Sequence, residues 1–136
     1  MNYYQVKLIK NLLGHKKLIK RLTFLWTAIV AYLCIVNVDG LPSMGFFEYD
    51  KAGHLAFHFG ITVMWFLFWR SNFYNTNKGA MIKAFLFSLI FGICIEIIQG
   101  FSKTRSADIQ DVYANIGGSI LGLVFIFILI KVESKF

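Results

Sequence analysis

Four blocks of apolar residues, separated by short polar stretches, constrain the fold of this chain more than any other feature. The blocks cover residues 22–38, 52–69, 81–100 and 112–130, and each holds 17–20 residues. A helix rises 1.5 Å per residue, so about 20 residues are needed to cross ~30 Å of hydrocarbon. The sequence therefore predicts an all-α membrane protein whose fold is a bundle of four transmembrane helices.

The composition supports a membrane protein and argues against a soluble one. Hydrophobic residues make up 57% of the chain and charged residues 15%, whereas soluble domains carry about 25% charged residues. The net charge of +7 could suggest nucleic acid, but the basic residues flank apolar spans instead of alternating with aromatic residues. Such flanking charges set topology and contact anionic lipid headgroups. We expect membrane lipids as partners and no nucleic acid.

The distribution of Lys and Arg predicts the orientation. Eleven of the 14 lie in the N-terminal tail, in the loop between the second and third blocks, and at the C-terminus. Positive charge stays in the cytoplasm, so both termini should be cytoplasmic and the protein should span the inner membrane. We expect three parts, namely a basic amphipathic segment (1–21), a four-helix membrane domain (22–130) and a cytoplasmic tail (131–136).

The two loops left on the outer side, 39–51 and 101–111, carry five of the seven acidic residues. Polar residues in and beside these loops could line one outward-facing pocket. We interpret eight of them as candidate binding residues: Asp50, Lys51, His54, Glu96, Gln99, Arg105, Asp111 and Asn115. The aromatic residues Trp65, Phe66, Phe68 and Trp69, at the other end of the second block, are expected to form an interfacial belt.

The spacing of the polar residues favours a shared pocket. Asp111 and Asn115 are four residues apart, as are His54 and His58, so each pair stacks on one helical face. Glu96 lies inside an apolar span about one turn from its end, where a carboxylate costs less than the few kcal/mol it costs at the helix centre, and it should still face the bundle. An interhelical clamp is the simpler alternative, but it needs only one or two polar pairs.

A metal site is a weaker alternative for the same residues. His54 and His58 have the spacing of helical zinc ligands, and Glu96 or Asp111 could complete a set. However, no second closely spaced ligand pair follows in the sequence. We therefore expect neither a metal nor a cofactor, and we interpret His58 as a core histidine bonded to a neighbouring helix.

Three short patterns carry a resemblance to a known family: Asp50-Lys51-x-x-His54, Glu96-x-x-Gln99-x-Phe101, and Arg105 followed by Asp111-x-x-x-Asn115-x-x-Gly118-x-x-x-Gly122. Together they are similar to the VanZ-like family of bacterial membrane proteins, over roughly residues 22–130. The resemblance implies a four-helix membrane domain of a family named after a protein linked to resistance against the glycopeptide teicoplanin. It implies no settled biochemical activity. The chain departs from the family in lacking the proline that often precedes the arginine, and His58 falls outside the pattern.

The sequence is compatible with three classes of function, namely a binding protein, an enzyme and a transporter. The leading hypothesis is an envelope protein whose pocket binds a lipid headgroup, a lipid-linked wall precursor or an amphiphilic antibiotic of the glycopeptide type. The alternative is a membrane hydrolase or transferase acting on envelope lipids, with His54 and Glu96 as candidate catalytic residues and Arg105 stabilising negative charge. Transport is disfavoured, because the polar residues stop near the outer third of the bundle.

Overall fold

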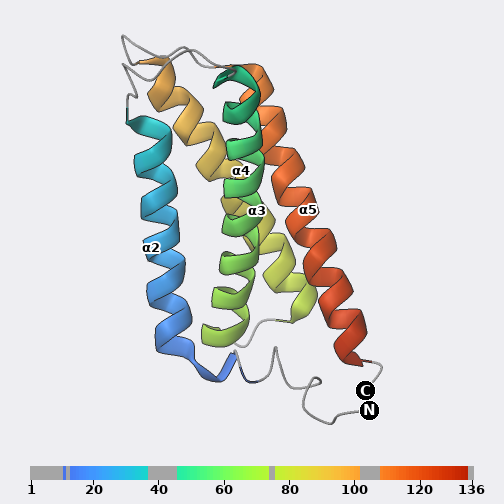
Figure 1. The fold of residues 1–136 in the computed structure, drawn as a ribbon. Helices are drawn as coiled ribbons and strands as arrows, with labels where there is room; N and C mark the ends of the chain where they lie inside the picture. The colour runs from blue at the N-terminus through green and yellow to red at the C-terminus, as the bar shows by residue number, and fades with distance from the viewer. Residues whose placement is uncertain (1–10, 12, 37–45, 74–75, 102–107, 135–136) are drawn as a thin grey trace.

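The computed structural model describes residue 11 and residues 13–36, 46–73, 76–101 and 108–134, with residues 46–50 described by their backbone alone. Four helices, labelled as in Figure 1, follow one another along the chain: α2 (Lys16–Ile35), α3 (Phe46–Asn72), α4 (Asn77–Gly100) and α5 (Ile109–Ser134). All four are long and apolar enough to cross a membrane. The predicted four-helix membrane fold is therefore confirmed.

The helices run alternately up and down, and α3 contacts each of the other three (Figure 1). Their outer faces carry large apolar side chains such as Leu25, Tyr32, Ile90 and Ile97, all of which are exposed. In water such a surface would be strongly unfavourable, whereas in a bilayer it contacts lipid tails. Many of the apolar residues therefore face the lipid, and the others pack in the core.

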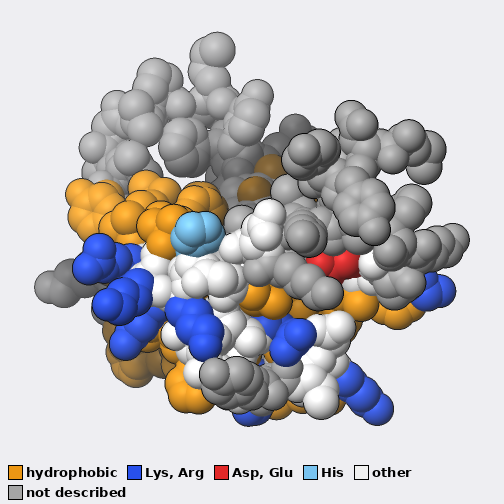
Figure 2. All heavy atoms as spheres, turned by 90° about the horizontal axis from the view of Figure 1, so that it is seen from below, with side chains coloured by type: hydrophobic (Ala, Val, Ile, Leu, Met, Phe, Trp, Pro, Cys, Tyr) orange, Lys and Arg blue, Asp and Glu red, His pale blue; other side chains and the backbone are white. Residues whose placement is uncertain are grey.

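One end of the bundle, which we call the basic end, is where α2 and α4 begin and α3 and α5 end. Figure 2 shows Lys and Arg side chains gathered over it. The helix segments that meet there contribute Lys16, Lys17, Lys20, Arg21, Arg70, Lys78, Lys83 and Lys131. Eight of the nine Lys and Arg residues that the structure describes therefore lie toward this end, and the ninth, Lys51, lies at the other.

Toward the basic end, the interior is aromatic. Trp65, Phe66 and Phe68 are no more than 6% exposed, and the Trp65 ring stacks on that of Phe87 with centroids 3.7 Å apart. The prediction that these residues form an interfacial belt was therefore wrong for three of the four. A run of aromatic residues fits a packed interior as well as an interface, because both remove apolar rings from water.

The backbones of α3 and α5 approach each other closely. A Cβ atom on Gly118 would overlap the carbonyl oxygen of Leu55, and one on Gly122 would lie 3.0 Å from Cβ of Thr62. Small residues four apart allow two backbones to meet in this way. Gly118 and Gly122, one turn apart on α5, therefore form the face that packs against α3.

Candidate functional site

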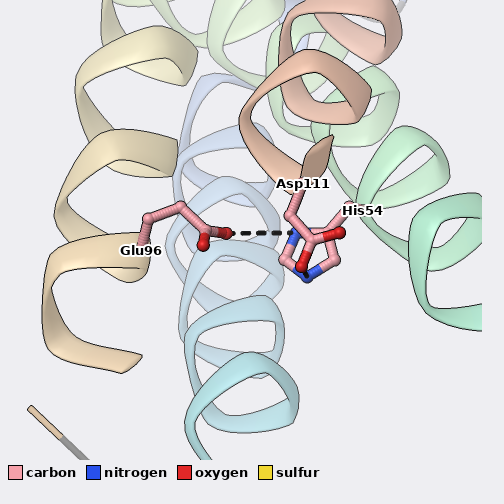
Figure 3. Close-up of side chains that lie close together, drawn as sticks. All are labelled: His54, Glu96 and Asp111. Atoms are coloured by element: carbon pink, nitrogen blue, oxygen red, sulfur yellow. Dashed lines mark ion pairs between the residues drawn. The ribbon is translucent and has the colours of Figure 1, made fainter. Parts of the chain in front are cut away.

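Four polar side chains are buried together at the end opposite the basic end. They come from three helices: His54 from α3, Glu96 from α4, and Asp111 and Asn115 from α5. Figure 3 shows the first three of these side chains close together. Their exposed fractions are 2%, 5%, 7% and 3% respectively. We call these four residues the polar cluster. Sequence spacing predicted that all four belong to one site, and the helix packing brings them together.

The imidazole of His54 lies at the centre of the polar cluster. Its Nδ1–H donates to Oδ1 of Asn115 at 3.0 Å, because an amide oxygen can only accept. The same nitrogen is 4.0 Å from Oε1 of Glu96, and Nε2 is 3.9 Å from Oδ2 of Asp111. The hydrogen bond to Asn115 fixes the ring orientation and leaves Nε2 as the nitrogen that can accept a proton or bind a ligand.

Asp108 makes three contacts beside the polar cluster that link helices α3, α4 and α5. Its Oδ1 accepts from the backbone N–H of Gln110 at 2.9 Å, which caps the start of α5. Its own N–H donates to Oε2 of Glu96 at 3.2 Å, and its Oδ2 is 3.7 Å from Nζ of Lys51. One residue thus links the beginning of α5 to α3 and α4, and it directs the Glu96 carboxylate.

Asp108→Ala is expected to lower the free energy of unfolding by about 1 kcal/mol, because the N-cap of α5 is lost. Asp108→Asn should leave stability nearly unchanged, since asparagine caps a helix as well as aspartate does and an exposed ion pair contributes little. Denaturant titration of the purified protein in bicelles measures both changes. Equal losses for the two variants would mean that the ion pair with Lys51, and not the cap, is what matters.

A second set of polar groups lies deeper, below the polar cluster. Ser119 Oγ–H donates to the backbone carbonyl of Asn115 at 2.8 Å, so its oxygen must accept from Ser88 Oγ–H, also at 2.8 Å. Ser88 must then accept from Nδ1–H of His58 at 2.8 Å. His58 is therefore bonded to a neighbouring helix, as predicted, and it is not arranged to deprotonate Ser88.

Sequence reasoning missed Ser88 and Ser119, and with them the depth of the polar interior. The expectation that polar residues stop near the outer third was wrong, since Ser88 lies near the middle of α4. A usable signal was present for Ser119, which is four residues after Asn115 and so on the same face of α5. Ser88 is eight residues before Glu96, about 80° around α4, so spacing alone does not place it in the site.

The remaining predicted residues lie at the margin of the site or outside the described residues. Lys51 is partly exposed at the rim, where it pairs with Asp108. Gln99 is turned toward α2, where its Nε2 donates to the backbone carbonyl of Cys34 at 2.8 Å. The side chain of Asp50 and the whole of Arg105 lie outside the residues that the structure describes.

The fold and the site together define a multi-pass membrane protein with a polar cluster buried near one end of a four-helix bundle. A family model described as VanZ/LLP1 matches residues 5–130. The chain therefore belongs to the VanZ/LLP1 family, as its resemblance to VanZ-like proteins predicted. Comparisons with curated proteins and with solved structures gave no significant match.

Proposed function

We propose that this protein binds the polar headgroup of an envelope amphiphile at the polar cluster. The observation that carries the proposal is the burial of two carboxylates, an imidazole and an amide at one point, from three different helices. Oε1 of Glu96 is buried and accepts no hydrogen bond from the described residues. We assign this buried carboxylate oxygen the role of accepting a hydrogen bond from the ligand, because buried polar atoms in proteins normally have a partner.

An interhelical clamp explains the polar cluster less well than a binding site does. Polar pairs between membrane helices stabilise a bundle by about 0.6 kcal/mol on average, while burying an acidic residue in a span carries a desolvation cost, which is a few kcal/mol at the helix centre and less near its end. Gln99 and Cys34 already provide such a clamp between α4 and α2 with uncharged groups. Holding two acidic residues beside a histidine for packing alone would therefore be unfavourable.

The ligand we propose has an anionic part as well as an apolar one. Lys51 lies at the rim of the cluster, and Arg105, whose planar guanidinium suits phosphate or carboxylate, follows α4 in sequence. Lipid headgroups, lipid-linked wall precursors and amphiphilic glycopeptide antibiotics all have this character. The basic end supports a bundle with cytoplasmic termini in the inner membrane, which would place the cluster on the outer side and fit a role in antibiotic resistance.

Arg105→Ala is expected to abolish ligand-dependent stabilisation while leaving the fold intact, because it removes the bidentate donor for the anionic group. The measurement is the shift in unfolding temperature of detergent-purified protein with a polyprenyl phosphate, a phosphatidylglycerol or teicoplanin. Lys103→Ala, two residues away, is the matched control and should keep most of the shift. A shift of wild-type size in Arg105→Ala would remove this residue from the site.

Catalysis at the same cluster is the second candidate, and the geometry of His54 favours it. Its ring is oriented by Asn115 and flanked by two carboxylates, which suits a general base that activates water. Turnover of phosphorylated or acylated lipids by wild type, lost in His54→Ala, would establish an enzyme. Binding without turnover of any envelope lipid tested would establish the binding function.

A further inference from the structure

We propose that His54, Glu96 and Asp111 form a binding site for a divalent transition-metal ion. One ligand atom from each of the three side chains lies within 4.8 Å of the other two, and all three residues are buried. Ligand atoms 2.0–2.2 Å from a tetrahedral zinc ion are about 3.4 Å apart. Side-chain movements of about an ångström would therefore close the three around one ion.

Two of the three side chains are already held by a second hydrogen bond, as ligands of metal sites usually are. Asn115 accepts from Nδ1–H of His54, which leaves Nε2 of the neutral ring as the metal-binding nitrogen. The backbone N–H of Asp108 binds Oε2 of Glu96, and the other oxygen, Oε1, lies 4.0 Å from Nδ1 of His54. Oε1 would therefore have to move around the ring toward Nε2, which is 3.9 Å from Oδ2 of Asp111, to join an ion there. Oε1 accepts no hydrogen bond from the described residues, so binding an ion would break none there.

The chemistry of the ligands selects the class of ion. One imidazole nitrogen with two carboxylates suits Zn²⁺ or a neighbouring transition metal, whereas Mg²⁺ and Ca²⁺ prefer oxygen ligands alone. The sequence did not favour a metal because its closely spaced pair was His54 and His58. In the structure Nδ1 of His58 bonds Ser88, and the set is completed from α4 and α5 instead.

The ion would also contact the anionic headgroup of the ligand, and this contact rests on the proposed function. Two carboxylates repel an anionic headgroup, whereas a dication held by them attracts one. Three protein ligands leave a fourth position of a tetrahedral ion open. We assign that position to a phosphate oxygen of the bound amphiphile, with Lys51 at the rim beside it.

Metal binding is tested first, in detergent and without added lipid. Wild type stripped with EDTA should take up one Zn²⁺ per chain, and Co²⁺ should give the visible spectrum of a tetrahedral nitrogen and oxygen site. Glu96→Gln and Asp111→Asn keep the side-chain shapes and should each weaken Zn²⁺ binding about 100-fold or more, since a ligand is lost. His15→Gln, which removes an exposed histidine, should bind as wild type does.

The ion site would be overturned by wild type that takes up no stoichiometric zinc, or by Glu96→Gln and Asp111→Asn variants that bind zinc as wild type does. Binding of Mg²⁺ as tight as that of Zn²⁺ would overturn the assignment to a transition metal. The Co²⁺ spectrum uses wild type alone, so the test stands even where a variant fails to fold.

The headgroup contact is tested separately, with a short-chain phosphatidic acid and the matching diacylglycerol. Zinc-loaded protein should bind the phosphatidic acid at least about tenfold more tightly than EDTA-treated protein does, which is 1.4 kcal/mol, and the diacylglycerol should show no such difference. Equal binding of phosphatidic acid with and without zinc would overturn the contact and leave the proposed function standing. Stoichiometric zinc without binding of any amphiphile would leave the ion site and overturn the function.

Discussion

Gly118→Ala should separate α5 from α3 and lower the free energy of unfolding by about 3 kcal/mol. The added Cβ would overlap the carbonyl oxygen of Leu55 and lie 2.9 Å from its carbonyl carbon. Both atoms belong to a helix backbone, so no change of rotamer relieves the contact and the helices themselves must move. Because Asp111 and Asn115 move with α5, ligand binding should fall together with stability.

Gly117→Ala is the matched control, since a Cβ there meets no atom within 4 Å. Alanine has the higher helix propensity, so this variant should be neutral or more stable by up to about 1 kcal/mol. Unfolding titrations of the two variants in bicelles provide the comparison. Similar losses of unfolding free energy in both variants would show that the α3 and α5 backbones are not in close contact at Gly118.

The two buried histidines of α3 should respond to substitution in different ways, although they lie one turn apart. His54→Ala removes the central group of the polar cluster and should weaken ligand binding about 100-fold, or about 2.8 kcal/mol, as truncation of buried polar contacts does. His58→Ala should instead lower the free energy of unfolding by about 2–4 kcal/mol, because it leaves a cavity and Ser88 without its donor. Its folded fraction should still bind the ligand.

Binding and unfolding have to be measured on both histidine variants. Thermal shifts with the same amphiphiles give the first quantity, and denaturant titration in bicelles gives the second. If His58→Ala lost binding while staying folded, the deeper serine chain would belong to the site. If His54→Ala bound as wild type does, the polar cluster would be a packing feature only.

The helices could be predicted because each apolar block has the length of a bilayer and almost no charge inside it. Their ends could not, as α2 shows by beginning at Lys16, within the segment expected at the membrane surface. Lysine and arginine side chains can extend from a helix to the headgroups, so basic residues do not mark where a span begins. Hydropathy predicts that a span exists more reliably than it predicts the residue at which the span begins.

The residues of the site could be found from spacing, but their partners could not. Asp111 and Asn115 share a face by their spacing, yet their proximity to His54 depends on Gly118 and Leu55 meeting. Gln99 follows Glu96 by three residues, which turns it about 60° away and leaves it facing α2. Ser88 and Ser119 were overlooked because single serines occur often in membrane helices.

The arrangement also bears on transport. The linked polar side chains extend from the polar cluster to Ser88, and beyond it the described core is mainly aromatic, with Trp65 stacked on Phe87, although Thr23, Thr62 and Ser71 are also buried there. Packed rings of this kind offer few hydrogen bonds to a polar solute. The bundle is therefore better suited to holding a ligand near one end than to passing it through.

The most direct test of the central claim is an experimental structure of the wild type crystallised from native lipid in a lipidic mesophase. We predict non-protein density in contact with at least two of His54, Glu96, Asp111 and Asn115, continuing toward Lys51. The contradicting result is a cluster whose four side chains bond only with the protein itself, with every lipid headgroup remaining outside the rim.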